Sequence, residues 1–171
     1  MTPSPLPSMR LAILLLALVA GPAAAQFAPA GSRAAGPRAT DLVTWRATAA
    51  PTARGGTSSV VLRATIAPGW RMYAMDSPVG RPLAVEVDAL PRGIATRAPR
   101  QSATRRAFDE AFQQHYPYFS GSAVVTVPVT VARGAARGRH AVAGSVRFAL
   151  CDDRVCLPPT TTPFRATVTV R

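Results

Sequence analysis

The chain has 171 residues, 20 basic side chains against 8 acidic ones, and a formal net charge of +12. Every basic side chain is an arginine, and the arginines are scattered along the chain rather than gathered in blocks. Because aromatic residues are not interleaved with them, the pattern excludes a base-stacking surface, and we expect no nucleic-acid partner.

The first 25 residues have the pattern of a secretory signal peptide. Arg10 precedes an apolar run over residues 11–20, and Ala23-Ala24-Ala25 provides a small-residue cleavage site. An uncleaved anchor is the alternative, but the run is shorter than the roughly 20 residues that span a bilayer. We therefore expect export to an oxidising compartment and no membrane span in the mature chain.

Residues 26–40 are rich in Ala, Gly, Pro and Arg and predict a flexible leader. From Asp41 onward, apolar and polar residues alternate in runs separated by turn signals such as Pro68-Gly69. We place these runs at residues 43–47, 60–66, 70–75, 83–88, 123–131, 142–150 and 164–170. Short strands without a βαβ rhythm predict one all-β domain over residues 41–171, an immunoglobulin-like antiparallel β-sandwich. Pro128 predicts an edge strand or a bulge.

One stretch, residues 104–116, has helical spacing. Phe108, Ala111, Phe112 and His115 fall at positions i, i+3, i+4 and i+7. We expect a short helix or an ordered loop there. His115 and His140 have no partner at metal-ligand spacing, so we expect no metal site and no bound cofactor.

Cys151 and Cys156 are the two cysteines of the chain. On one straight strand they would lie roughly 16 Å apart, whereas a disulfide needs Cα atoms within about 4.4–6.8 Å. The chain must therefore fold back between them, and residues 152–155 suit the tip of a hairpin. If Phe148 and Leu150 face the core, Cys151 faces the opposite side of the strand.

Spacing alone leaves the role of this cysteine pair open. A bridge that closes six residues stabilises the fold by roughly 2 kcal/mol, against about 4.7 kcal/mol for a hundred-residue loop. A tight bridge at the surface suits a bond that opens and closes. A static disulfide in a non-catalytic binding module is the second hypothesis, and an arginine-rich module for anionic envelope polymers is the third.

The segment from Cys151 to Pro159, a cysteine hairpin followed by two prolines, resembles the N-terminal periplasmic domain of the DsbD thiol:disulfide interchange protein family. Further segments that resemble this family are Pro68–Tyr73, Phe108–Phe112 and Thr126–Val129. The likeness runs from about Asp41 to Arg171 and departs where Arg71 replaces a common histidine.

The resemblance implies an electron relay of the protein-disulfide reductase type, with Cys151 and Cys156 as its catalytic pair. Cys156 would form the mixed disulfide with a partner, and Cys151 would resolve it. Tyr73 matches an active-site tyrosine. A cap that covers the pair matches Asp109, Glu110 and Phe112, with Phe112 as the lid aromatic and Phe108 or Tyr116 as alternatives.

Four acidic residues are expected near the pair: Asp109, Glu110, Asp152 and Asp153. Because a thiolate is the attacking species, their charges would disfavour it, and Arg154 would partly offset them. We therefore expect a pair that reacts slowly until a partner docks.

The partners that the resemblance implies are thioredoxin-like periplasmic proteins of the disulfide isomerase or cytochrome c maturation type. The family's proteins continue into a membrane-embedded domain and a thioredoxin-like domain, whereas this sequence ends at Arg171. We therefore expect electrons to come from a separate membrane thiol reductant. We expect the chain itself to be a periplasmic monomer.

Overall fold

The computed structural model of the chain describes residues 36–110 and 112–171. Residues Gly36 to Arg171 form one compact unit. The predicted signal peptide and most of the predicted leader lie outside the described residues. Ala39 is 4% exposed and belongs to the core, so packed structure starts just before Asp41.

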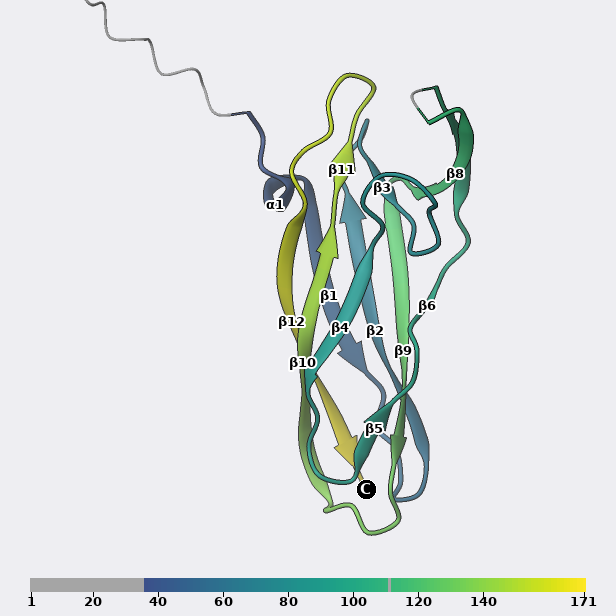
Figure 1. The fold of residues 1–171 in the computed structure, drawn as a ribbon. Coiled ribbons are helices and arrows are strands. Elements are labelled where there is room, and N and C mark those ends of the chain that lie inside the picture. Colours follow the sequence, from purple (N-terminus) through teal and green to yellow (C-terminus); the bar gives the residue numbers. More distant parts are fainter. Residues whose placement is uncertain (1–35, 111) are drawn as a thin grey trace, which may run out of the picture. The chain divides into compact units, whose positions relative to one another are not determined.

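The first sheet contains five strands, all paired antiparallel. Its main path runs β1 (Val43–Ala49), β2 (Thr57–Ile66), β9 (Ser122–Val131) and β5 (Ile94–Thr96), and β6 (Arg100–Gln101) also pairs with β9 (Figure 1). A four-residue helix, α1 (Ala39–Leu42), leads into β1.

The second sheet has the order β12 (Thr160–Val170), β10 (Gly138–Phe148) and β4 (Ala84–Ala89), again antiparallel. Alternate side chains of both sheets form the main core. Among its fully buried members are Val60, Leu62, Val125, Val127, Val142, Val146, Phe148 and Val168. The Trp45 ring of β1 packs on Phe148 of β10, with centroids 5.8 Å apart. The predicted all-β sandwich is confirmed.

A third sheet lies at one end of the sandwich and has the order β11 (Leu150–Cys151), β3 (Arg71–Tyr73), β8 (Gln114–Phe119) and β7 (Arg105–Asp109). Figure 1 shows how it arises: β10 continues toward β11, β2 toward β3, and β8 leads into β9. This sheet carries the first cysteine.

The expected helix or ordered loop over residues 104–116 is instead a β-hairpin of β7 and β8. Ala107 pairs with Tyr116, and Phe108 pairs with His115. The helical spacing is misleading because Phe108 and His115, which it places on one helix face, lie on opposite strands of the hairpin with its turn between them. In addition, Tyr116 and Pro117 are both buried, so β8 lacks the alternation that marks a half-exposed strand.

Pro128 does not mark an edge strand, because β9 lies between β2 and the β5–β6 side of its sheet. β5 ends opposite Val129 and β6 begins opposite Thr126, so the neighbouring strand is interrupted beside Pro128. The Arg97 N–H donates to the Pro128 carbonyl oxygen at 3.0 Å across this gap. The missing N–H of proline is therefore tolerated within a central strand.

Candidate functional site

Cys151 and Cys156 form a disulfide at the tip of a hairpin, with Cα atoms 4.0 Å apart. The two residues are an antiparallel bridge pair, and Leu157 N donates to the Leu150 carbonyl oxygen just outside it at 2.8 Å. The predicted reversal of the chain between the cysteines is confirmed.

The acidic tip of this hairpin is held by one carboxylate. Asp152 Oδ1 accepts hydrogen bonds from the backbone N–H groups of Arg154 and Val155, each at 2.7 Å. Asp152 N in turn donates to the Val155 carbonyl oxygen at 3.0 Å. These amide donors lower the pKa of Asp152, because they favour its ionised form. Asp152 therefore shapes the loop.

The two sulfur-bearing residues differ in exposure. Cys151 is 8% exposed, whereas Cys156 is exposed. Strand parity explains the position of Cys151: Phe148 and Leu150 belong to the main core, while Ala149 and Cys151 belong to a second, smaller cluster on the other face. This side of the disulfide is closed to solvent, and the Cys156 side is open to it.

The second cluster is built around Tyr73 and Tyr116. Their rings lie 5.2 Å apart between centroids. The Tyr73 oxygen lies 3.6 Å from Cys151 Sγ, and since a disulfide sulfur carries no proton, the hydroxyl is the donor. Burial raises the pKa of Tyr73, and the charges of Tyr116 and Asp109 add to the rise. Tyr73 is therefore a neutral hydrogen-bond donor at physiological pH.

The connection between β3 and β4 covers the Tyr73 ring. Val79 is 5% exposed and packs in the same cluster. Gly80 has a φ of +71°, and a Cβ placed there would lie 2.3 Å from Tyr73 Cζ. Only glycine allows the backbone to approach the ring this closely. Ser77 Oγ donates to the Val79 carbonyl oxygen at 2.9 Å and closes the turn.

Arg71 is the cross-strand neighbour of Cys151. Its Nη2 donates to Asp153 Oδ1 in the cysteine loop. Its guanidinium also lies over the Tyr118 ring, 5.6 Å from the centroid. A hydrogen bond with Tyr116 raises the pKa of Arg71. Burial lowers this pKa and the charge of Asp153 raises it, and the net change is upward. Arg71 thus connects β3, β8 and the loop.

The residues expected to form a cap lie in or next to the β7–β8 turn. Asp109 ends β7, and its Oδ1 accepts a hydrogen bond from Phe112 N at 3.1 Å. Glu110 is exposed, and its carbonyl oxygen accepts a hydrogen bond from Gln113 Nε2 at 2.7 Å. The Phe112 side chain is 58% exposed, whereas Tyr116 of the same hairpin is buried against Tyr73.

The structure therefore brings Tyr73, Asp152 and Asp153 together with the two cysteines. Sequence reasoning gave no site role to Gly80, Tyr118 or the charge of Arg71. The signal for Arg71 was its place within the matched segment Pro68–Tyr73, two residues before Tyr73. No local signal pointed to Gly80, which reaches the site through tertiary packing.

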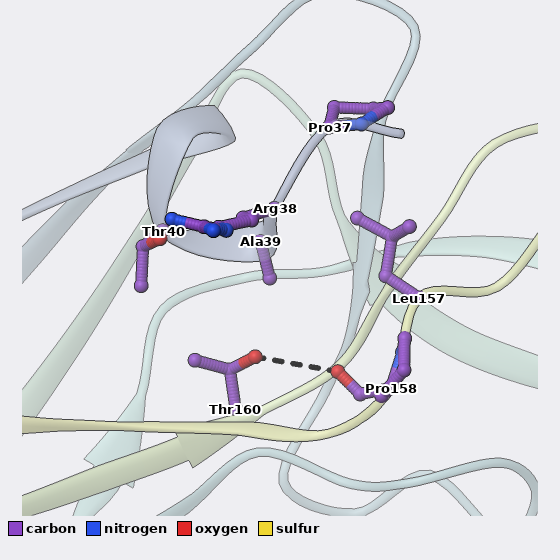
Figure 2. Close-up of a pocket in the computed structure, with 7 residues that line it drawn as sticks. All are labelled: Pro37, Arg38, Ala39, Thr40, Leu157, Pro158 and Thr160. Atoms are coloured by element: carbon purple, nitrogen blue, oxygen red, sulfur yellow. Dashed lines mark hydrogen bonds between the residues drawn. The ribbon is translucent and has the colours of Figure 1, made fainter. Parts of the chain in front are cut away.

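A cavity of about 320 Å³ lies beside the cysteine hairpin, between the α1 region and the segment after Cys156 (Figure 2). Pro37, Ala39 and Thr40 line one side of it, and Leu157, Pro158 and Thr160 line the other. Neither cysteine lines this cavity, so the disulfide lies outside it.

Within residues 36–110 and 112–171, no three His, Cys, Asp or Glu side chains are grouped so that they could hold a metal ion. No helix in this described part is long and apolar enough to cross a membrane.

Comparison with solved structures gives two relatives of interest. The N-terminal domain of DsbD from Neisseria meningitidis, in the reduced form, is 22% identical, with a TM-score of 0.49 over 75% of this chain and 86% of that one. The N-terminal periplasmic domain of ScsB from Proteus mirabilis is 15% identical, with a TM-score of 0.51 over 75% of this chain. The chain spans 47% of the ScsB structure, and this likeness supports the fold.

No curated protein sequence matches the chain. The family described as "Thiol:disulfide interchange protein DsbD, N-terminal" matches it over residues 39–167, which is most of its length and includes both cysteines. The chain therefore belongs to the family of DsbD N-terminal domains.

Proposed function

We propose that this chain is a periplasmic electron relay that passes reducing equivalents through Cys151 and Cys156 to oxidised thioredoxin-like partners. Membership of the DsbD N-terminal family supports thiol:disulfide interchange as its activity. The single observation that carries the proposal is the unequal exposure of the two cysteines within one disulfide.

Because the two cysteines differ in exposure, we give their sulfurs different roles in the exchange. In the reduced domain, the Cys156 thiolate is the group that can reach a partner's disulfide, because its side chain is exposed. It bonds to one partner sulfur and releases the other as a thiolate. Buried Cys151 then attacks Cys156 Sγ, which breaks the mixed disulfide and re-forms the internal one. The partner gains two electrons, and this domain loses two.

The opposite reaction reloads the domain. A donor thiolate attacks exposed Cys156, the internal disulfide breaks, and its electron pair leaves on Cys151. The second thiolate of the donor then attacks the donor sulfur of this mixed disulfide, which frees Cys156 as a thiolate and leaves the donor oxidised. We propose that a membrane thiol reductant supplies this donor. The partners of the reduced domain are oxidised proteins of the disulfide isomerase or cytochrome c maturation type.

The β7–β8 hairpin serves as the cap in this proposal. It forms the outer part of the same sheet as Cys151, and it carries Asp109, Glu110 and Phe112 at or next to its tip. Before a partner docks, an aromatic side chain of this hairpin covers Cys156 in the reduced domain and shields the thiol from small oxidants, and docking displaces it. The carboxylates near the pair disfavour the thiolate until a partner docks.

Redox equilibration against glutathione tests the proposal. A relay pair has a reduction potential of roughly −200 to −270 mV, whereas a static structural disulfide lies below about −300 mV. The free thiols are counted at each potential after acid quenching and alkylation, and the Cys151→Ala, Cys156→Ala double variant is the blank. A disulfide that stays oxidised throughout this range would contradict the relay. The chain would then be a binding module with a static bridge.

A further inference from the structure

Arg71 is the cross-strand neighbour of the buried cysteine, Cys151. It is directly opposite Cys151 in the antiparallel register of β3 and β11. Side chains opposed in this way lie on the same face of the sheet, with Cβ atoms about 4.5–5.5 Å apart. Arg71 therefore brings a permanent positive charge to the strand that neighbours Cys151.

The guanidinium of Arg71 is fixed by partners on two other segments. Asp153 accepts its hydrogen bond from within the cysteine loop, and the Tyr118 ring lies beneath it. The Arg71 side chain is 35% exposed, whereas that of Asp153 is 79% exposed. The cation thus sits on the protein side of the ion pair, and its counterion sits toward solvent.

Other polar groups also face the disulfide. β3 contributes the Tyr73 hydroxyl, β8 contributes Tyr116, and Asp109 of β7 acts on Tyr73. The loop contributes Asp152, which binds two amides, together with Asp153 and exposed Arg154. Among these groups, Arg71 is the cation whose residue is the register partner of Cys151, and Asp153 is its counterion.

We propose that Arg71 is a positioning residue for the exchange: its charge stabilises the Cys151 thiolate, and its ion pair with Asp153 sets how strongly it does so. This inference rests on the proposed function. It explains why an arginine, rather than a neutral residue, stands opposite the buried cysteine.

The Cys151 thiolate occurs in both directions of the exchange. When a donor thiolate bonds to Cys156 Sγ, the bond between Cys156 and Cys151 breaks, and the electron pair leaves on Cys151. When the domain reduces a partner, the Cys151 thiolate attacks the mixed disulfide and gives up that pair to the new internal bond. A nearby cation lowers the energy of the thiolate in both steps.

Two substitutions distinguish this charge effect from a purely structural role in holding the loop. Each of them breaks the same ion pair, so a structural role predicts the same change in both variants, whereas a charge effect predicts opposite changes. Arg71→Met removes the cation and should raise the pKa of the Cys151 thiol by about half to one unit. Asp153→Asn removes the counterion and should lower that pKa. Alkylation rates against pH measure it in a Cys156→Ala background.

The equilibrium with glutathione, measured with both cysteines present, should follow the same signs. At a pH above the thiol pKa, where the reduced pair is ionised, Arg71→Met should move it about three- to tenfold toward the disulfide, where tenfold corresponds to about 30 mV. Asp153→Asn should move it toward the dithiol. Arg63→Met, which removes an exposed arginine from β2 in another sheet, is the control for net charge and should have no effect.

Shifts of opposite sign in the two variants support the proposal. Shifts of the same sign, or an Arg71→Met protein that behaves like Arg63→Met, would overturn it. Asp153→Asn alters an exposed side chain, so a shift toward the disulfide in that variant overturns the proposal even where Arg71→Met does not fold. Failure of the proposed function is distinct from these results, because the wild-type disulfide would then not exchange at all.

Discussion

The Tyr73 hydroxyl lies 3.6 Å from Cys151 Sγ, on the side of the disulfide that is packed against protein. Cys156, bonded to the same sulfur, is exposed. Cys151 Sγ therefore has a hydrogen-bond donor and belongs to a buried residue, whereas Cys156 is exposed to solvent.

Tyr73→Phe keeps the ring and removes only the hydroxyl donor. We expect the pKa of the Cys151 thiol to rise by about half to one unit, because a hydrogen bond to the thiolate favours the charged form. Thiolate absorbance against pH in a Cys156→Ala background measures this rise. Tyr118→Phe, on the same face but without this contact, is the matched control. An unchanged pKa in Tyr73→Phe would show that the hydroxyl has no effect on the thiolate.

The raised pKa of Tyr73 predicts a loss of stability in alkaline solution. Burial keeps Tyr73 protonated in the folded chain, whereas a tyrosine in the unfolded chain ionises near pH 10. Its contribution is fully present below that pH and is lost as pH rises toward the folded-state value. Denaturant unfolding of the oxidised protein between about pH 9 and pH 11 should therefore show a steeper decline for the wild type than for Tyr73→Phe. Equal slopes would contradict this assignment.

Asp152 is expected to hold the cysteines close together in the reduced loop. Asp152→Ala leaves the N–H groups of Arg154 and Val155 without their acceptor. The dithiol loop should then open more readily, and the glutathione equilibrium should shift about threefold or more toward the dithiol. Asp152→Asn retains an acceptor oxygen and should stay near the wild type. A larger shift in Asp152→Asn than in Asp152→Ala would point to charge rather than to the turn.

Phe112 and Phe108 provide a matched pair for the proposed cap. Phe112 is 58% exposed in the β7–β8 turn, and Phe108 is 47% exposed and packs edge-on against His115, with centroids 5.2 Å apart. We expect Phe112→Ala to speed alkylation of the reduced pair severalfold, because the lid aromatic is lost. Phe108→Ala should leave that rate unchanged. Substitution at such exposed positions changes stability by about 0.5 kcal/mol or less, so thermal unfolding of the two variants should be similar.

Much of the fold could be predicted from the sequence, because alternation records which face of a strand is buried. The parity of Phe148 and Leu150 correctly placed Cys151 away from the main core. The four-residue tip between the cysteines was also predicted, since cysteine spacing and turn-forming aspartates both favour a hairpin.

The third sheet could not be predicted in the same way. β3 lies within the strand predicted at residues 70–75, but its pairing with β11 and β8 depends on tertiary structure, and β11, at two residues, is too short for a periodic signal. β8 is buried at Tyr116 and Pro117 in succession, so it lacks alternation. Site residues such as Gly80 and Tyr118 were missed for the same reason: their roles depend on which strands meet.

Covalent trapping tests the central claim most directly. The Cys151→Ala variant, reduced and then mixed with a thioredoxin-like protein whose single remaining active-site cysteine is a mixed disulfide with glutathione, should accumulate a disulfide through Cys156 as glutathione leaves, because neither protein then has a second thiol to resolve it. The Cys156→Ala variant should give almost none, since its remaining sulfur is on the packed side. Non-reducing electrophoresis and mass spectrometry of the linked peptides measure both. No adduct through Cys156, or an equal yield from the two variants, would contradict the account.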